Sequence, residues 1–168
     1  MHKKIDFNKL LQISGENCGR LEEELYKFSK VFEKEFDFKY FLKNPRYASQ
    51  DKRKLAQSIF PGFLPLFWDL IELLIKEGLV DRVAEISKEF TKILADMDDK
   101  RFDVVVFSEK PTKELIAKAK KKAGDKISLR FEIDPSILGG FIWKTMDGKM
   151  LDASLRGRLA QLKEEINA

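Results

Sequence analysis

Residues 102–109, FDVVVFSE, decide how this chain folds, because the period of its apolar residues changes there. Before Arg101, apolar side chains recur every three or four residues, which is the period of helices buried on one face. The short β-branched run that follows is typical of a buried strand. We therefore predict an α+β fold, with a bundle of five or six helices over residues 1–100 and a small α/β domain over residues 101–168.

Two segments dominate the predicted helical bundle. A long helix is expected to begin after the Ser14-Gly15 turn, and its apolar face consists of Leu21, Leu25, Phe28, Phe32 and Phe36. Residues 63–77 are apolar on most sides, and only Asp69, Glu72 and Lys76 interrupt them. A helix that is apolar nearly all round belongs at the centre of a bundle, so we place this one there.

The remaining elements of the C-terminal half follow from the same patterns. KPTKELIAKAKKKAG predicts a helix and KISLRFEI a strand, while GGFIWKT and KMLD predict two strands joined by a tight turn at Asp147-Gly148. The last segment, LDASLRGRLAQLKEEINA, spaces its apolar residues by three or four; these are Leu151, Leu155, Leu159, Leu162 and Ile166. We expect this last helix to cover the sheet with its leucines.

Gly157 is unusual inside that helix, since glycine costs about 0.5–1 kcal/mol relative to alanine in a helix interior. With Ala153 and Ala160 it lies on the side opposite the leucines. Small residues would let a partner backbone approach closely, which makes Gly157 and Ala160 candidate partner-binding residues. The alternative is that the glycine is merely tolerated in the first turn after Ser154.

The composition leaves little for catalysis. One cysteine, Cys18, excludes an internal disulfide, and one histidine, His2, removes most His/Cys metal sites and the usual Ser/His/Asp triad. We identify no catalytic, cofactor-binding or metal-ligating residues. Asp134 and Asp152 are interpreted as turn and cap residues in preference to an acid/base pair. No segment is typical of a secretory signal or a membrane span.

A glycine pair and a lysine cluster invite other functional interpretations. Gly139-Gly140 lacks the rest of a nucleotide-binding motif, and we predict a bulge or a close crossing there. Lys118, Lys120, Lys121 and Lys122 suit either the solvated side of a helix or a phosphate-binding patch. A nucleic-acid-binding α/β module is therefore an alternative function, for which Phe131, Phe141 and Trp143 could supply stacking surfaces. Against it, 32 Lys and Arg are interspersed with 28 Asp and Glu.

One stretch resembles a known family. Residues 133–162, IDPSILGGFIWKTMDGKMLDASLRGRLAQL, resemble the C-terminal signature of the delta subunit of bacterial F-type ATP synthases and its mitochondrial counterpart, the oligomycin-sensitivity-conferring protein. That signature has two Asp-x-Ser units, of which the first precedes a Gly-Gly pair and the second precedes the last helix. The matching residues are Asp134, Ser136, Gly139, Gly140, Asp152, Ser154, Arg156, Arg158 and Leu159.

The resemblance implies a non-catalytic stator adaptor that needs no cofactor. In that family the helical bundle holds N-terminal segments of the α subunits, and the C-terminal domain engages the b-type peripheral stalk, so that the catalytic head cannot turn with the rotor. It further implies a monomer within the complex, without nucleic acid, at the cytoplasmic face of the cell membrane and in contact with the membrane only through the complex. An apolar groove for the α-subunit segment is expected from Phe7, Leu10, Leu11 and Trp68.

Overall fold

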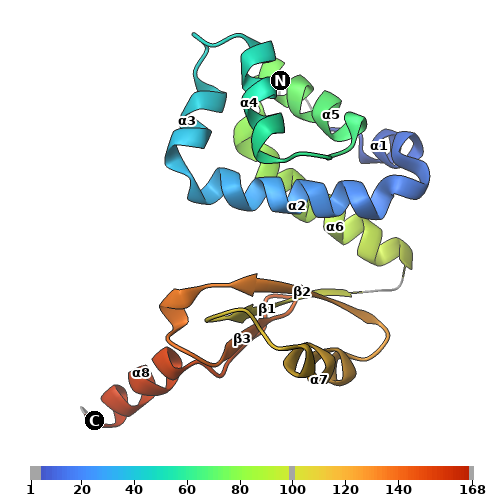
Figure 1. Cartoon of the computed structure of the whole chain (residues 1–168). Coiled ribbons are helices and arrows are strands. Elements are labelled where there is room, and N and C mark those ends of the chain that lie inside the picture. The colour runs from blue at the N-terminus through green and yellow to red at the C-terminus, as the bar shows by residue number, and fades with distance from the viewer. Residues whose placement is uncertain (1–4, 99–100, 167–168) are drawn as a thin grey trace. The chain divides into compact units, whose positions relative to one another are not determined.

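A computed structural model describes residues 5–98 and 101–166 of the chain. Two compact units make up the chain, the first ending at Leu94 and the second beginning at Ala95 (Figure 1). This division lies a few residues before the predicted change of period at Arg101, which is the first residue of the first strand. Each unit is described by itself below.

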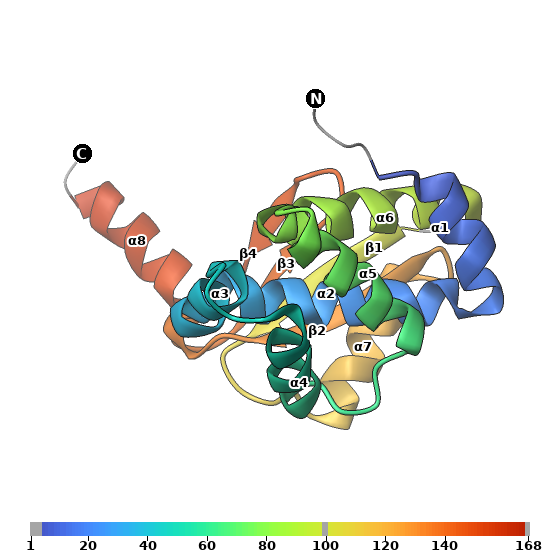
Figure 2. The same ribbon diagram turned by 90° about the horizontal axis from the view of Figure 1, so that it is seen from above.

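The first unit is helical, as predicted. Its described residues form six α-helices, with two short 3₁₀ turns at Gly15–Asn17 and Val80–Arg82. The helices are α1 (Phe7–Ser14), α2 (Cys18–Lys34), α3 (Phe36–Lys43), α4 (Ser49–Ile59), α5 (Pro65–Lys76) and α6 (Val83–Asp98), of which the last four residues of α6 fall in the second unit. Figures 1 and 2 show the long helix α2 running through this unit, and the buried Glu22 of α2 accepts a hydrogen bond from Thr91 of α6.

Aromatic side chains fill the core of the helical unit. Phe28 of α2 is fully buried and touches Phe38 of α3, Phe60 after α4, and Phe67 of α5, with ring centroids 5.4–5.6 Å apart. Most of the apolar residues of α5 are also buried. Leu73, however, is 53% exposed, so the apolar face predicted for residues 63–77 belongs to the core but the helix is not enclosed on every side.

The predicted buried face of α2 is wrong at Phe36. Helix α2 ends at Lys34, because Glu35 takes an extended conformation with φ −96° and ψ 99°. Phe36 therefore begins the separate helix α3, where its side chain is 77% exposed. A helical pattern that continues across the end of a helix no longer describes one face.

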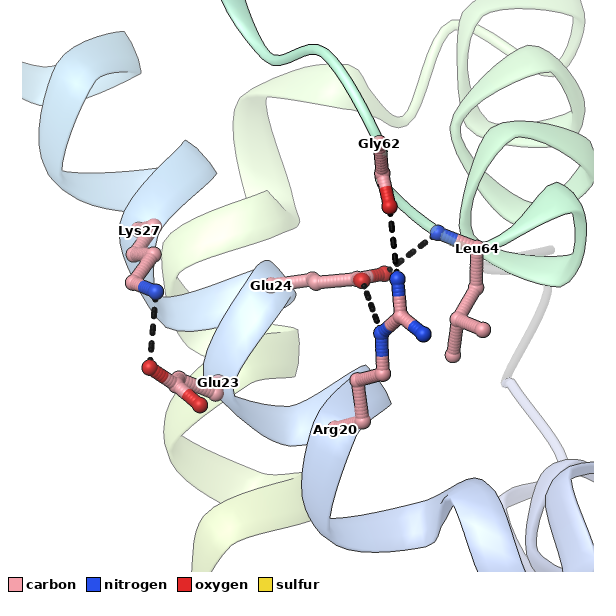
Figure 3. A network of polar contacts seen from close by, with 6 residues as sticks. All are labelled: Arg20, Glu23, Glu24, Lys27, Gly62 and Leu64. Atoms are coloured by element: carbon pink, nitrogen blue, oxygen red, sulfur yellow. Dashed lines mark hydrogen bonds and ion pairs between the residues drawn. The ribbon is translucent and has the colours of Figure 1, made fainter.

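A carboxylate of α2 fastens the start of α5 to the rest of the bundle (Figure 3). The backbone N–H of Leu64, one residue before α5, donates to Glu24 Oε2 at 2.9 Å. Arg20 binds the other oxygen of Glu24 at 3.0 Å and also donates to the carbonyl of Gly62 at 2.6 Å. Because Glu24 is buried, these bonds hold the loop between α4 and α5 against α2.

Replacing Glu24 by alanine is expected to lower the free energy of unfolding by about 1–3 kcal/mol, since it leaves the Leu64 N–H without its acceptor. The matched control is Glu23→Ala on the same helix. Among the described residues Glu23 pairs only with Lys27, at the surface, and its loss should cost at most about 0.5 kcal/mol. Urea unfolding followed by circular dichroism measures both. Equal effects of the two substitutions would contradict this role of Glu24.

The second unit is built on a mixed four-stranded sheet, which confirms the α+β prediction. Its elements are β1 (Arg101–Phe107), α7 (Lys113–Ala123), β2 (Ile127–Ile133), β3 (Phe141–Lys144), β4 (Met150–Asp152) and α8 (Leu155–Ile166). The strand order is β2-β1-β3-β4, with β1 parallel to β2 and antiparallel to β3. The predicted hairpin joins β3 to β4, and Gly148 supplies the positive φ of +85° that this tight turn needs.

A buried carboxylate ties β1 to the β3–β4 hairpin. Asp103 is 2% exposed, and it accepts hydrogen bonds from Trp143 Nε1 at 2.7 Å and from the Met146 N–H at 3.3 Å. The rings of Phe131 and Phe141 both contact Phe107, with centroids 6.1 and 6.3 Å apart. The aromatic residues weighed as nucleic-acid stacking surfaces are thus engaged within the sheet.

Helix α8 does not cover the sheet, so that prediction is wrong. No described residue of the helix is buried, and Figures 1 and 2 both show it extending away from the strands of its unit. Leu155, Leu159 and Leu162 are each more than half exposed, and Ile166 is 83% exposed. The spacing of the leucines correctly predicted an apolar helical face, but it carries no information on what packs against that face.

Candidate interaction surfaces

Helix α8 leaves the sheet from a base that consists of the two Asp-x-Ser units and the glycine pair between them. At the end of β2, the carboxylate of Asp134 accepts the N–H of Ser136 at 3.0 Å and so begins the short turn Pro135–Ile137. The N–H of Asp134 donates to the carbonyl of Phe107 at 2.7 Å, which holds this turn to β1. The first Asp-x-Ser unit is therefore a turn, as predicted.

The second Asp-x-Ser unit starts α8. Asp152 Oδ1 accepts both the N–H of Ser154, at 2.9 Å, and its hydroxyl, at 2.6 Å. The same serine oxygen accepts the N–H of Gly157 at 3.0 Å and caps the helix. The hydrogen bond from the Ser154 hydroxyl has the largest effect on the pKa of Asp152, which it lowers. The hydrogen bond from the Ser154 N–H lowers this pKa further. Because the charged form is favoured on folding, this turn contributes stability above the ordinary pKa of aspartate and loses it as the pH falls through the lowered value.

Between these two units, Gly139 and Gly140 permit a close crossing of the chain. Both have positive φ, +108° and +77°. A Cβ atom on Gly140 would lie 2.2 Å from the carbonyl oxygen of Ala153, and one on Gly139 would lie 3.0 Å from Leu155 Cδ1. Across this crossing the N–H of Leu155 donates to the Gly139 carbonyl at 3.0 Å. The close crossing predicted for the glycine pair is confirmed.

The same base leaves little space for a side chain at Gly157. A Cβ atom there would lie 2.7–2.8 Å from the carboxylate atoms of Asp152. The first turn of α8 thus has room for a glycine beside the Asp152 carboxylate, but not for a larger residue unless Asp152 moves. Sequence reasoning missed this contact, although the spacing of Asp152, Ser154 and Gly157 around a helix start is a signal that could have found it.

Gly157→Ala is expected to give no gain in stability, although alanine is the better helix former by about 1 kcal/mol. The new methyl group displaces the Asp152 carboxylate, which orients the Ser154 hydroxyl, and so weakens the helix cap that Ser154 forms. In an Asp152→Ala background the same change should become stabilising, because the obstacle is gone. Thermal unfolding of the four proteins of this double-mutant cycle tests the coupling. A stabilising effect of similar size in both backgrounds would show that the aspartate does not restrict residue 157.

The exposed apolar residues around this base form what we call the leucine stripe. Its members come from β4 and from one face of α8, and each is more than half exposed; they are Leu151, Leu155, Leu159, Leu162 and Ile166. Leu138 lies next to the glycine pair, 60% exposed and with a φ of +58° that is uncommon for leucine. Large apolar side chains that are left exposed along one face of a helix are typical of interaction sites. Arg156, Arg158 and Ala160 are exposed on the same helix.

In the helical unit, the residues predicted to form a groove contribute to the core. Leu10 and Trp68 are 7% and 4% exposed, and Phe7 and Leu11 are half-buried. The ring of Phe7 stacks on Phe90 of α6 with centroids 6.4 Å apart. Their part in binding a partner stays a prediction.

The described residues offer little else for a chemical site. Within residues 5–98 and 101–166, no group of three or more His, Cys, Asp or Glu side chains is placed to hold a metal ion, and no helix is long and apolar enough to cross a membrane. His2 lies outside the described residues. The lysines of the cluster on α7 are all exposed, as expected for the solvated side of a helix.

Comparison with known proteins yields one family. The family model for the ATP synthase delta (OSCP) subunit matches residues 10–166 of this chain. The chain is 27% identical to the ATP synthase subunit delta of Geobacter sp. (strain M21), over 94% of this chain and 92% of the relative. It is 30% identical to that of Gloeobacter violaceus, over 79% and 75%. It is 29% identical to the sodium-ion-specific subunit delta of Propionigenium modestum, over 87% and 86%.

A solved structure shares the fold. A chain in the cryo-EM structure of the mitochondrial ATP synthase hexamer of Toxoplasma gondii superimposes with a TM-score of 0.50 at 18% identity, covering 96% of this chain and 95% of that one. The family match extends over both units, whereas the signature stretch at residues 133–162 lies in the second unit alone. It also decides against the nucleic-acid-binding alternative. The chain belongs to the ATP synthase delta (OSCP) subunit family, whose members are non-catalytic stator subunits of the F-type ATP synthase.

Proposed function

We propose that the C-terminal unit binds the b-type peripheral stalk through the leucine stripe, and not through the side of α8 that carries Gly157 and Ala160. The single observation that supports this choice is the exposure of the stripe, from 51% at Leu155 to 83% at Ile166. An amphipathic partner helix could cover these leucines and bury them as the core of an interface.

The base of α8 suits this role mechanically. The capped first turn and the crossing at Gly139-Gly140 fix the direction in which the helix leaves the sheet. A stator has to resist the torque of the rotor, so a stalk-binding helix needs a rigid attachment to its own domain. Six of the family signature residues, Asp134, Ser136, Gly139, Gly140, Asp152 and Ser154, supply that attachment.

Replacing Leu159 by serine is expected to weaken binding of a soluble b-subunit segment by roughly 10- to 100-fold, the equivalent of about 1.5–3 kcal/mol for a leucine buried only in the complex. Stability of the free protein should change by less than about 0.5 kcal/mol, because Leu159 is 60% exposed. Leu115→Ser is the matched control, since that leucine lies on α7 and is 46% exposed.

Calorimetry with the purified full chain measures the affinities of Leu159→Ser and Leu115→Ser for the soluble b-subunit segment. Unchanged affinity of Leu159→Ser, combined with loss of binding by Ala160→Leu, would place the stalk on the small-residue side of α8. A loss of stability in Leu159→Ser would instead show that the stripe packs within the protein.

The helical unit, in this proposal, binds the N-terminal segment of an α subunit, and the two domains take one partner each. The support is the family match, which extends over the helices of this unit, together with the half-buried apolar residues Phe7 and Leu11. We also propose that residues 1–100 fold alone, which cooperative thermal unfolding of that fragment would test. The proposed location is the cytoplasmic face of the cell membrane, held there by the complex.

A further inference from the structure

The outer side of α3 carries two exposed aromatic rings. Phe36 is 77% exposed and Tyr40 61%, and their rings stack with centroids 6.3 Å apart and planes within 17°. Their spacing of four residues places them next to each other along the helix. Neither ring is part of the core of the unit, since both lie on the side of α3 away from the buried Phe38 and Leu42.

Beside these rings the surface is hollowed. The hollow has a volume of about 570 Å³, and its walls are Phe36, Tyr40, Lys39, Lys43, Arg46 and the turn at Asn44-Pro45. These residues come from one helix and the turn that ends it, so the hollow belongs wholly to the helical unit. It shares no residue with the predicted groove on α1 and α5 or with the leucine stripe.

Three cations and no carboxylate line this hollow, but two of the three cations are already engaged within the unit. Lys43 is paired with Asp81 at 2.8 Å, and the ammonium group of Lys39 lies over the ring of Phe32 at 5.4 Å. In the part of the chain that the structure describes, Arg46 has no ion-pair partner, and its side chain is exposed. A guanidinium in this position favours a carboxylate, which it can bind with two parallel hydrogen bonds.

We infer that the outer face of α3 binds an acidic peptide segment that carries an apolar or aromatic anchor, with the anchor against Phe36 and Tyr40 and a carboxylate on Arg46. The combination of exposed aromatic rings with an arginine is typical of the residues that dominate protein interfaces. Single-stranded nucleic acid fits less well, because it follows a basic groove over several nucleotides and this hollow is confined to one helix and its turn. The surface is a third contact site, in addition to the two of the proposed function.

The test uses the full chain and a fluorescein-labelled peptide, Glu-Glu-Leu-Glu-Glu-Phe-Glu-Glu-Leu-Glu, with fluorescence anisotropy as the readout. Phe36→Ala and Arg46→Glu should each weaken binding by about tenfold, since each removes one half of the recognition. Ile13→Ala and Lys54→Glu are the matched controls, because they alter an exposed apolar residue and an exposed lysine elsewhere on the same unit. Both should bind as the unsubstituted chain does.

Two further probes separate the alternatives. The same peptide with glutamine in place of every glutamate should bind much more weakly, and a ten-nucleotide oligothymidine should bind no better than that neutral peptide. The inference is overturned if the acidic peptide shows no saturable binding, if the control substitutions weaken it as much as Phe36→Ala does, if the glutamine peptide binds equally well, or if the oligonucleotide binds more tightly and loses affinity in Arg46→Glu.

Discussion

Replacing Phe28 by alanine is expected to lower the free energy of unfolding of the helical unit by roughly 3–5 kcal/mol, because it opens a large cavity in a packed core. The ring is fully buried, and three of its neighbours, Phe38, Phe60 and Phe67, approach it from three other segments of the chain. No single helix can shift to fill the space, since each neighbour is held by its own packing. Urea unfolding followed by circular dichroism at the helical band measures the loss.

Phe36→Ala is the matched control for this prediction. It removes the same ring from the next helix, but the ring is 77% exposed, so the change should stay within about 0.5 kcal/mol. The pair of substitutions thus measures the value of burial for one side-chain type. If both cost the same, the division of the aromatic residues into core and surface is wrong.

Replacing Gly140 by alanine is expected to destabilise the second unit by roughly 2–5 kcal/mol, through backbone strain at positive φ and a steric clash. The φ of +77° disfavours any residue with a Cβ, and this Cβ would stand 2.2 Å from the Ala153 carbonyl oxygen. Relief would require the backbone before α8 to move. The hydrogen bond from the Ala153 N–H to the Phe141 carbonyl, 2.9 Å long, would then be disturbed as well.

Gly148→Ala separates the two causes. Gly148 has a similar φ of +85°, but nothing lies within 4 Å of its Cβ position, so only the backbone strain remains, at about 1–2 kcal/mol. Hydrogen exchange of the β1 and β3 amides reports the stability of this unit alone. A Gly140→Ala protein no less stable than Gly148→Ala would mean that the crossing can widen without cost. We expect the stalk affinity of Gly140→Ala to fall too, because the direction of α8 depends on this crossing.

Much of the local structure could be predicted from particular residues. The change of period at Arg101 predicted the first strand, and the Asp147-Gly148 turn predicted the β3–β4 hairpin. Asp134 and Asp152 act as the turn and cap residues that were predicted for them in preference to an acid/base pair. These features depend on interactions over only a few residues, such as one side chain and a neighbouring N–H, so they are written in short stretches of sequence.

The tertiary structure alone decided which apolar faces are covered. Leu159 and Phe28 both belong to regular helical stripes, yet one is 60% exposed and the other fully buried. The reason is that periodicity defines a face of a helix, while burial depends on segments distant in sequence that meet it. In the same way, Gly157 was unexplained until the Asp152 carboxylate was found within 2.8 Å of its missing Cβ. By itself the sequence determined the elements and the family, whereas contacts in space decided which helical faces are buried and that the leucines of α8 are exposed.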